Sequence, residues 1–559
     1  MHQQGKAMAR RFEKAKSHLL ALPLLFSAVL SGAIVLDGNT IMRGDLAGGI
    51  EENYISSFTL QDGVLWLFLT VVLYILLMGL TGIYKKYSAL FFDKKEKTDH
   101  PARLFLVVFL IFLVAWLPYV LTYFPGAVFA DAFDSIWQGT VNAYSNHHPV
   151  LYTLWVKLCM EIGNALQGTV SAGVFVYTVS QTICMAAVMA YFVLWLRQKG
   201  VNGFYCGVVS AFIAIFPLFP YYAVAMWKDT YFALALFLFA LYHIDMVCSQ
   251  MEILRSRKGL FRYFVLAFLI VFLRNNGLYV CVFSALAMLL IFHKKGLKFF
   301  GRYLVAEIAF LVMVVVIQGP IFSLFVVPTE KVESLSIPNQ QIFAVFADEN
   351  GVYDQEDIDF ISQIWDVEEM QQKYTPCLAD TPKWYMDRFD QTFLNEHVGE
   401  YLKFWVTLGL KNPLIYVRAW LMETLCFWSP TRDGYTAYVQ HGVWANNIGL
   451  VQTNLWYNWF GWDFSQLVYP RYCISSGLFF WVYMFSTMVG YSAVPKKQRF
   501  KALLPAMPTI GLWLTIMIAT PVASSLRYVY VLVLLTPLLV VFPALMRRKL
   551  ADAPDHKPE

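Results

Sequence analysis

Residues 124–155, FPGAVFADAFDSIWQGTVNAYSNHHPVLYTLW, place two aspartates, a glutamine and two histidines directly after a long apolar run. If residues 129–138 form a helix, Asp131, Asp134 and Gln138 share one face, because positions i, i+3 and i+7 point the same way. A carboxylate within hydrogen-bond reach of a hydroxyl can accept its proton as a general base. The stretch therefore predicts a polar site at the end of an apolar helix.

The SNHHP segment within it predicts the start of a second surface helix, since Pro149 suits a first helical turn. His147 and His148 could serve as hydrogen-bonding residues at this start, or either could act as a ligand or a proton relay. Asp131, Asp134 and His148 could together hold a divalent metal, but their spacing matches no common ligand pattern. We therefore expect no metal and no firmly implied cofactor.

Three basic residues are candidates for binding an anion. Lys228 in MWKD, Arg274 in FLRNNG and Arg527 in SLRYVYV each lie at the end of an apolar run. A cation in that position is costly unless it meets an anion or water. Lys228 could simply pair with Asp229, and Arg527 could extend toward water. Taken together, with Asp229 and Asn275 beside two of them, they predict an anion site at the membrane interface.

The composition indicates that membrane helices position these residues. The chain of 559 residues is 58% hydrophobic and 14% charged, whereas soluble proteins have about 25% charged residues. The net charge of +5 is dispersed in short clusters, which excludes a nucleic-acid partner that would need one continuous basic face. The eight cysteines show no CxxC and no metal-ligand spacing, so we interpret them as packing residues.

The apolar runs predict an all-α polytopic membrane protein with about twelve transmembrane helices, because a spanning helix needs about 20 mainly apolar residues. The first run follows a basic stretch without a clear cleavage site and is expected to be an uncleaved anchor. The two runs around the RNNG turn could instead form one broken or re-entrant element. The runs centre on residues 18–36, 64–83, 104–123, 172–196, 204–219, 231–247, 260–273, 278–292, 303–326, 471–490, 502–519 and 526–545.

Basic residues predict the orientation, because they favour cytoplasmic loops. They precede the first run and recur in every second connection, for example at residues 85–97, 255–258 and 293–298. Both termini are therefore expected in the cytoplasm of a multi-pass protein of the cell membrane. The loop 124–171, the MWKD and RNNG segments and the long segment 327–470 are expected on the extracytoplasmic side.

These boundaries predict five parts of the chain. The segment 327–470 is expected to be a mostly helical extracytoplasmic domain on the membrane surface, with tryptophans near the head groups. The other parts are residues 1–103 with two accessory transmembrane helices, 104–326 as the core transmembrane module, 471–546 as C-terminal transmembrane helices and 547–559 as a cytoplasmic tail.

Over roughly residues 104–528 this layout resembles the GT-C superfamily of polytopic glycosyltransferases, which take sugars from polyprenyl-phosphate carriers outside the membrane. Protein O-mannosyltransferases and the aminoarabinose transferase of lipid A are of this type. In that group a catalytic acid follows a core membrane helix, and a histidine-proline element then opens a surface helix. Asp131 and His148 with Pro149 match these positions. The paired Asp-Glu of the superfamily is replaced here by DAFD, which leaves open whether Asp131 or Asp134 is the base.

The chain also resembles a group of Gram-positive membrane proteins that share NHHP, MWKD and an arginine-asparagine-glycine turn. The resemblance to the GT-C superfamily implies transfer of a sugar from a lipid-linked donor to a cell-envelope glycan, lipid or protein. It implies Asp131 or Asp134 as the base and Lys228, Arg274 and Arg527 as ligands of the carrier phosphate. The residues expected to contact substrate are Trp137, Gln138, Tyr144, His147, His148, Asp229 and Asn275.

Three other functions fit part of the pattern. A transporter or flippase would also place polar residues such as Gln181 within membrane helices, although the two similar halves common in transporters are not evident. A polysaccharide polymerase or ligase would instead make Arg388, Arg418 and Arg432 of the large outer segment central. A structural scaffold would leave the polar cluster after residue 124 unexplained.

Overall fold

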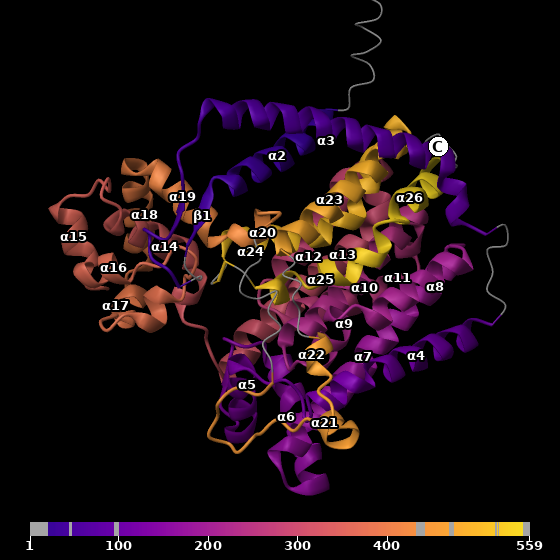
Figure 1. The fold of residues 1–559 in the computed structure, drawn as a ribbon, viewed down its shortest axis with the longest axis horizontal. Coiled ribbons are helices and arrows are strands. Elements are labelled where there is room, and N and C mark those ends of the chain that lie inside the picture. Colours follow the sequence, from indigo (N-terminus) through magenta and orange to yellow (C-terminus); the bar gives the residue numbers. More distant parts are fainter. Residues whose placement is uncertain are drawn as a thin grey trace, which may run out of the picture.

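The computed structural model describes residues 21–43, 47–93, 100–431, 442–468, 475–519, 522–523 and 525–551, and these are mainly helical (Figure 1). The all-α class is therefore confirmed. Strands occur only as two short pairs among the described residues. β1 (Thr40–Met42) pairs antiparallel with β2 (Asn53–Ile55), and β3 (Tyr144–Ser145) pairs parallel with β4 (Val326–Val327).

Within the described residues, seven helices are long and apolar enough to cross a membrane, and nine if each of two bent helix pairs is one span. Twelve spans are not confirmed, in part because α11 (Arg257–Leu273) and α12 (Gly277–Ile291) have only 17 and 15 residues. The seven are Ala21–Gly38, Leu60–Phe91, Pro101–Thr122, Val170–Gln198, Lys228–Cys248, His293–Leu324 and Lys496–Ile518; the pairs are Gly203–Ile215 with Leu218–Val224 and Val531–Leu538 with Phe542–Ala551.

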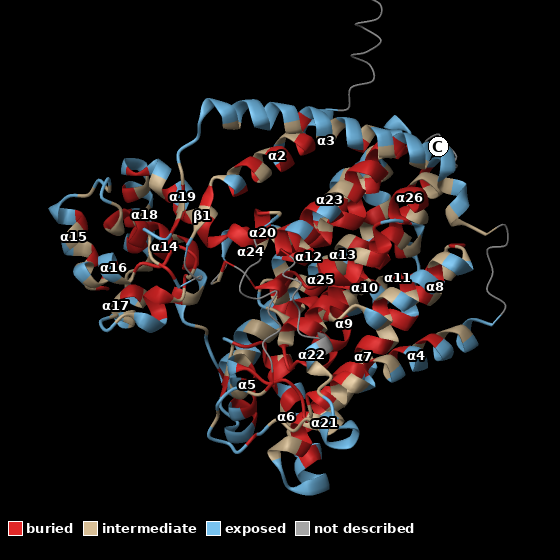
Figure 2. Cartoon of the chain, in the orientation of Figure 1, coloured by how far each residue is buried: buried red, intermediate tan, exposed pale blue. Residues whose placement is uncertain are grey.

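These helices form a bundle whose inner members are buried and whose outer members expose apolar side chains. Figure 2 shows α10 in the interior and α3 along the outer edge. On α3 the apolar Leu67, Phe68 and Ile75 are exposed, an arrangement that suits contact with lipid better than with water. The helices of the bundle are α2 (Ala21–Gly38), α3 (Leu60–Tyr87), α4 (Pro101–Thr122), α7 (Val170–Gln198), α8 (Gly203–Ile215), α9 (Leu218–Val224), α10 (Lys228–Cys248), α11, α12, α13 (Gly296–Val316), α23 (Ser476–Ala493), α24 (Met507–Ile518), α25 (Val531–Leu535) and α26 (Phe542–Ala551).

The RNNG turn joins two helices that pack against each other. α11 ends at Leu273 and α12 begins at Gly277, and the two helices are in contact. A side chain at Gly277 would place its Cβ 2.0 Å from the carbonyl oxygen of Ile270. The tight approach therefore requires glycine, and it fixes Arg274 at the end of this hairpin.

A second helical core lies apart from the bundle, at the left of Figure 1, within the segment predicted as the extracytoplasmic domain. It packs around Phe343, Trp365 and Tyr401, all fully buried. Pro413 occupies the first turn of its last helix, as its position in the sequence indicates. The helices are α14 (Ser336–Ala347), α15 (Gln355–Ile361), α16 (Val367–Lys373), α17 (Gln391–Glu396), α18 (Val398–Lys411) and α19 (Pro413–Glu423).

Shorter helices complete the fold around the bundle. Two surface helices, α5 (Ala130–Val141) and α6 (Val150–Gln167), form where the polar stretch predicted them. α20 (Leu425–Trp428), α21 (Leu455–Phe460) and α22 (Ser465–Val468) follow the second core. The basic N-terminal segment, Arg432 and the end of the predicted tail lie outside the described residues.

Candidate functional site

An extended segment, residues 124–128, brings the start of α5 beside the start of α10. Ala127 exchanges backbone hydrogen bonds with residues 224–226 at 3.0 and 2.8 Å, and Val128 does so with residues 442–444 at 3.0 Å each. Residues far apart in the sequence thus meet at one place. The first turn of α5, which carries Asp131, lies next to the first residue of α10, Lys228.

Two residues of the bundle interior fix this segment and its partner. A Cβ at Gly126 would lie 2.2 Å from the Thr178 hydroxyl oxygen, so only glycine allows this approach to α7. The Gln181 side chain, fully buried in α7, donates from Nε2 to the carbonyl oxygens of Tyr222, Ala223 and Ala225 at 2.9, 3.2 and 2.6 Å. Gln181 therefore positions the chain that leads into α10.

Helix α5 presents its acids at its first turns. Asp131 lies in the first turn, where the partial positive charge of the helix N-terminus favours a carboxylate. Asn142 ends the helix with φ of 58°, a left-handed conformation that asparagine tolerates better than most residues. Gln138 is buried and accepts a hydrogen bond from the backbone N–H of Ser145 at 3.0 Å, so it secures the turn after α5.

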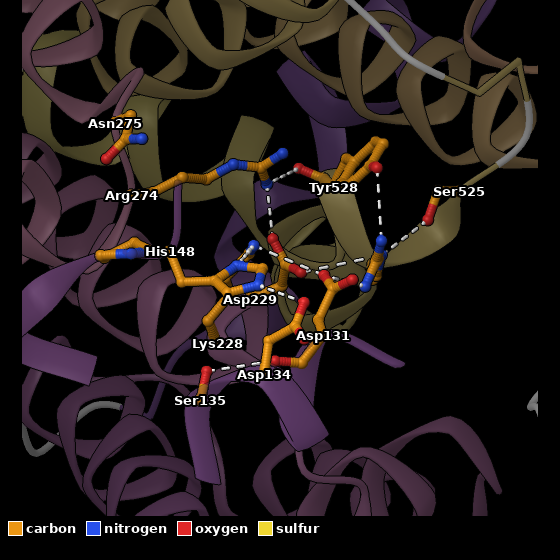
Figure 3. A network of polar contacts seen from close by, with 12 residues as sticks. Asp131, Asp134, Ser135, His148, Lys228, Asp229, Arg274, Asn275, Ser525 and Tyr528 are labelled. Atoms are coloured by element: carbon orange, nitrogen blue, oxygen red, sulfur yellow. Dashed lines mark hydrogen bonds and ion pairs between the residues drawn. The ribbon is translucent and has the colours of Figure 1, made fainter. Parts of the chain in front are cut away.

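Asp131 contacts two of the three predicted cations. Its Oδ2 accepts a hydrogen bond from Arg527 Nη1 at 2.8 Å and lies 3.4 Å from Lys228 Nζ (Figure 3). Arg527 comes from the short helix η9 (Leu526–Val529) and is 396 positions from Asp131. One carboxylate oxygen is thus shared between two cations from separate elements.

Arg274 joins the same network through a second, fully buried acid. Its Nη1 lies 2.8 Å from Asp229 Oδ1, and Asp229 Oδ2 lies 3.8 Å from Arg527 Nε. Within this inner network the three basic side chains of Lys228, Arg274 and Arg527 face the two acidic side chains of Asp131 and Asp229. A third acid, Asp134, lies on the exposed rim, so the excess of basic groups is confined to the inner network, where it favours an anionic ligand.

His148 links Lys228 to Asp134. Its Nδ1 lies 2.7 Å from Lys228 Nζ, and its Nε2 lies 3.4 Å from Asp134 Oδ2. An ammonium group can only donate, so Nδ1 accepts and Nε2 carries the proton that faces Asp134. The hydrogen bonds thus assign a neutral imidazole to His148.

Neighbouring charges set the protonation of these groups. Burial raises the pKa of the Asp131 carboxyl, but the positive charges of Arg527 and Lys228 lower it by more, so that pKa lies well below its usual range. Burial and the Lys228 ammonium lower the pKa of His148, although its hydrogen bond to Asp134 acts in the opposite direction. At neutral pH the site therefore holds an ionised Asp131 and an uncharged His148.

Solvent reaches the network from the side of Asp134. The exposed fraction of the side chain is 67% for Asp134, 30% for Asp131 and 16% for Lys228, but only 2% for His148. The exposure of the acidic side chains thus decreases from Asp134 through Asp131 to the buried Asp229. A ligand arriving from solvent would meet Asp134 first and Asp131 next.

Comparison with protein families identifies one relationship. The family of unknown function DUF6020 matches residues 135–557. The chain belongs to this family. Lys228, Arg274 and Arg527 lie within the matched region, and Asp131 and Asp134 lie just before it. No curated protein and no solved structure matched the chain.

The other predicted site residues of this DUF6020 member lie around the network or away from it. Trp137 and His147 are exposed, and in the described part of the chain neither forms a hydrogen bond or an ion pair with Asp131. Asn275, also exposed, donates from Nδ2 to the carbonyl oxygen of Asn146 at 2.9 Å and so ties the RNNG turn to the loop before α6. Tyr144 is buried and bonds to Asn142, so it belongs to the turn after α5.

Two aromatic residues at the site were missed in the sequence. The carbonyl oxygen of Tyr528 accepts from Arg274 Nη1 at 3.3 Å, and its ring centre lies 4.7 and 5.1 Å from the guanidinium carbons of Arg274 and Arg527. Trp227, beside Lys228, has its ring centre 5.8 Å from the guanidinium carbon of Arg527 and packs against Phe129 at a tilt of 35°. Such cation–π contacts orient guanidinium groups. The signal in the sequence was that Trp227 directly precedes Lys228 and Tyr528 directly follows Arg527.

The arrangement can hold an anion and move a proton, and these abilities come from its own side chains. Among the described residues, no group of three or more histidine, cysteine, aspartate or glutamate side chains could bind a metal ion. Arginine forms bidentate hydrogen bonds with phosphate, and lysine binds it as a point charge. A carboxylate between such cations is placed to act on a hydroxyl group next to a bound phosphate.

Proposed function

We propose that this DUF6020 member is a membrane glycosyltransferase that moves a sugar from a polyprenyl-phosphate carrier to a hydroxyl of an extracytoplasmic cell-envelope acceptor. The proposal is supported chiefly by one observation: Asp131 Oδ2 is shared between Arg527 and Lys228. A general base and the cations for a leaving phosphate are thereby within one network. The resemblance of the loop layout to GT-C enzymes supports the same function.

Binding of the carrier phosphate would change the chemistry of Asp131. Arg527 and Lys228 hold the pKa of Asp131 low, which makes the carboxylate a weak base. A phosphate has several acceptor oxygens and competes for both cations. When Arg527 and Lys228 turn to the phosphate, the pKa of Asp131 rises toward its ordinary value, so donor binding activates the base.

The transfer step uses each group once. The acceptor oxygen forms a bond to the anomeric carbon of the sugar, and Asp131 takes the proton of that hydroxyl. The bond between the anomeric carbon and the phosphate oxygen breaks, and its electron pair leaves with the polyprenyl phosphate. Lys228, Arg274 and Arg527 offset the charge on the leaving phosphate, a form of stabilisation worth about 3 kcal/mol for a well-placed donor.

Asp131 is preferred to Asp134 as the base. Within the described residues Asp134 forms no ion pair with Arg527 or Lys228, and it lies on the exposed rim. Its hydrogen bond to His148 suits it to orient the imidazole that holds Lys228. Asp134 and His148 are therefore proposed as positioning residues.

The rival functions have less support in the geometry. Gln181, which suggested a transport path, is occupied with backbone carbonyl groups next to α10. Arg388 and Arg418, which a polymerase or ligase would use, are exposed on the second helical core and form no ion pair with the described network. A lipid flippase stays the second candidate, because a phosphate site at a membrane interface would serve it too.

The proposal is tested by transfer of radiolabelled sugar from membrane lipid to cell-envelope polymer in cells that carry the wild type, Asp131→Asn, Asp134→Asn or no protein. We expect Asp131→Asn to lower transfer by roughly 10²- to 10⁴-fold, the range for loss of a general base. Asp134→Asn should lower transfer by less than about tenfold, since it changes only an exposed hydrogen bond. The two variants carry the same chemical change three positions apart.

A measurement of polyprenyl-phosphate binding distinguishes a catalytic base at position 131 from a carboxylate that only supports the structure. Because Asp131→Asn removes the anion that competes for Arg527 and Lys228, purified Asp131→Asn should bind polyprenyl phosphate at least as tightly as the wild type does. Full transfer by Asp131→Asn would remove this residue from the mechanism. Equal labelling of the envelope with and without the protein would overturn the proposed glycosyltransferase activity. The distribution of the labelled lipid between the two leaflets would then test whether the protein is a flippase.

A further inference from the structure

A cavity outside the candidate site is lined by three basic residues. It has a volume of about 250 Å³ and lies between the short helix η2 (Glu252–Arg255) and the start of α13. Arg255, Lys298 and Arg302 contribute the positive charge. This volume is below the roughly 300 to 1,000 Å³ of drug-sized sites, so the cavity suits a small charged group.

Two of these cations have no acidic partner in the described part of the chain. Glu252 lies 3.3 Å from Arg255 and 3.1 Å from Lys295 and neutralises part of their charge. No described acidic side chain forms an ion pair with Lys298 or Arg302, although both line the same cavity. The cavity therefore keeps a positive charge that an anion would neutralise.

Aromatic side chains complete the lining of the cavity. The Phe299 ring centre lies 5.7 Å from the guanidinium carbon of Arg255, which holds the guanidinium over the ring. Tyr303 also lines the cavity, and its hydroxyl lies 3.1 Å from that of Tyr263. The cavity thus combines basic groups with aromatic rings, which suit the phosphate and the adjoining apolar part of a lipid.

The cavity lies at the far ends of the helices that carry the candidate site. α10 begins with Lys228 and ends with Cys248, and its 21 residues span about 32 Å. α11 returns from Arg257 to Leu273, directly before Arg274. The hydrocarbon core of a bilayer is about 30 Å thick. The cavity and the candidate site therefore lie at opposite surfaces of the membrane if these helices cross it.

We propose that this cavity, the basic cavity, binds the phosphate group of an anionic lipid at the membrane surface opposite Asp131. Cationic pockets between membrane helices at the interface attract such head groups through charge and hydrogen bonds. The inference is independent of the proposed transfer reaction, since it uses none of the residues assigned to that reaction. A bound lipid would connect η2 to α13 and stabilise the bundle at this surface.

The test uses the purified full-length protein in a neutral detergent, titrated with short-chain phosphatidylglycerol, phosphatidylcholine or inorganic phosphate while thermal unfolding is followed. We expect phosphatidylglycerol to raise the unfolding temperature. In Lys298→Gln/Arg302→Gln the apparent Kd should be roughly 30-fold weaker, from about fivefold for each basic residue near an anionic lipid. Lys298→Arg/Arg302→Lys, which keeps both charges, should retain most of the affinity.

The matched control is Lys258→Gln/Lys294→Gln, which removes two exposed charges from the same surface without altering the cavity lining. Equal weakening in both double variants would show a diffuse charge effect and overturn the site, as would undiminished binding by Lys298→Gln/Arg302→Gln. If inorganic phosphate alone raises the unfolding temperature, and Lys298→Gln/Arg302→Gln abolishes this rise, the cavity is a phosphate site whose ligand is a soluble phosphate. A shift with phosphatidylglycerol but not with inorganic phosphate assigns the lipid.

Discussion

His148 is the residue at which the candidate site responds to pH. Its Nδ1 accepts from Lys228, and its Nε2 faces Asp134. Protonation of Nδ1 would place two positive groups 2.7 Å apart. The pKa of His148 is therefore lowered in the folded protein, by burial and by Lys228, and the folded state favours the neutral form.

The sign of the pH effect follows from this shift. Below the ordinary histidine pKa of about 6.5, the unfolded chain binds a proton that the folded chain resists, so stability falls as the pH is lowered from 7 to 5. Asp131 has a folded pKa below that of the unfolded chain, and its contribution is lost only at more acidic pH. Thermal unfolding at pH 7, 6 and 5 should show a smaller decline in His148→Gln than in the wild type.

His147→Gln is the control for this measurement, since His147 is exposed and adjacent in the sequence. Its pH profile should follow that of the wild type. A His148→Gln profile that also follows the wild type would show that Lys228 does not depend on a neutral His148.

The sequence indicated which residue types meet at the site, but not all of its members. The cost of a cation at a membrane surface singled out Lys228 and Arg527 before their contact with Asp131 was known. Helical periodicity placed Gln138 on the same face as Asp131, yet Gln138 bonds to a backbone N–H. Periodicity cannot distinguish a ligand-binding amide from one that secures a turn. The carbonyl oxygen of Tyr528 has no signature in the sequence at all.

At the scale of elements, Gln181 connects the interior of α7 to the start of α10. Gln181→Met keeps the side-chain length but leaves three buried carbonyl groups without this donor, and we expect a loss of stability of roughly 1–3 kcal/mol. The segment before Lys228 should also shift. Affinity for polyprenyl phosphate should therefore fall in Gln181→Met, measured at a temperature where the variant is folded.

Ser210→Ala provides the comparison for Gln181→Met, because the Ser210 hydroxyl donates within α8 to the carbonyl oxygen of Cys206 at 2.8 Å. It should change neither phosphate affinity nor the start of α10. If Gln181→Met loses stability but binds polyprenyl phosphate like the wild type, Gln181 supports the fold without positioning the site.

The elements themselves were predictable to the extent that apolar runs are long. Runs that became α3, α4 and α10 stand out from the composition alone, whereas the runs near 260–273 and 278–292 became the shorter hairpin of α11 and α12. Run length does not show where a helix breaks, because a turn such as RNNG is fixed by the close contact of Gly277 with Ile270. The pairing of residues 124–128 with two distant segments depends on tertiary structure and left no local pattern.

At the scale of the whole molecule, the second helical core and the candidate site share one side of the bundle. β4, just before this core, pairs with β3 in the loop between α5 and α6. Cys377, between α16 and α17, packs with the apolar cluster of the bundle, and its carbonyl oxygen accepts a hydrogen bond at 3.0 Å from the backbone N–H of Ala523, four positions before Arg527. The segment that holds the core is therefore connected to the candidate site at two separate places, and we propose that it selects the acceptor.

The proposed orientation puts this side outside the cell and the basic cavity inside, since basic residues favour cytoplasmic loops. Two single cysteines test it: Val352→Cys on the second core and Lys294→Cys beside η3 (His293–Lys295), both at exposed positions. A membrane-impermeant maleimide should label Val352→Cys in intact cells and Lys294→Cys only after permeabilisation, with the wild type as the blank for the native cysteines. The reverse pattern would place Asp131 in the cytoplasm, and transfer to an extracytoplasmic acceptor would then be impossible.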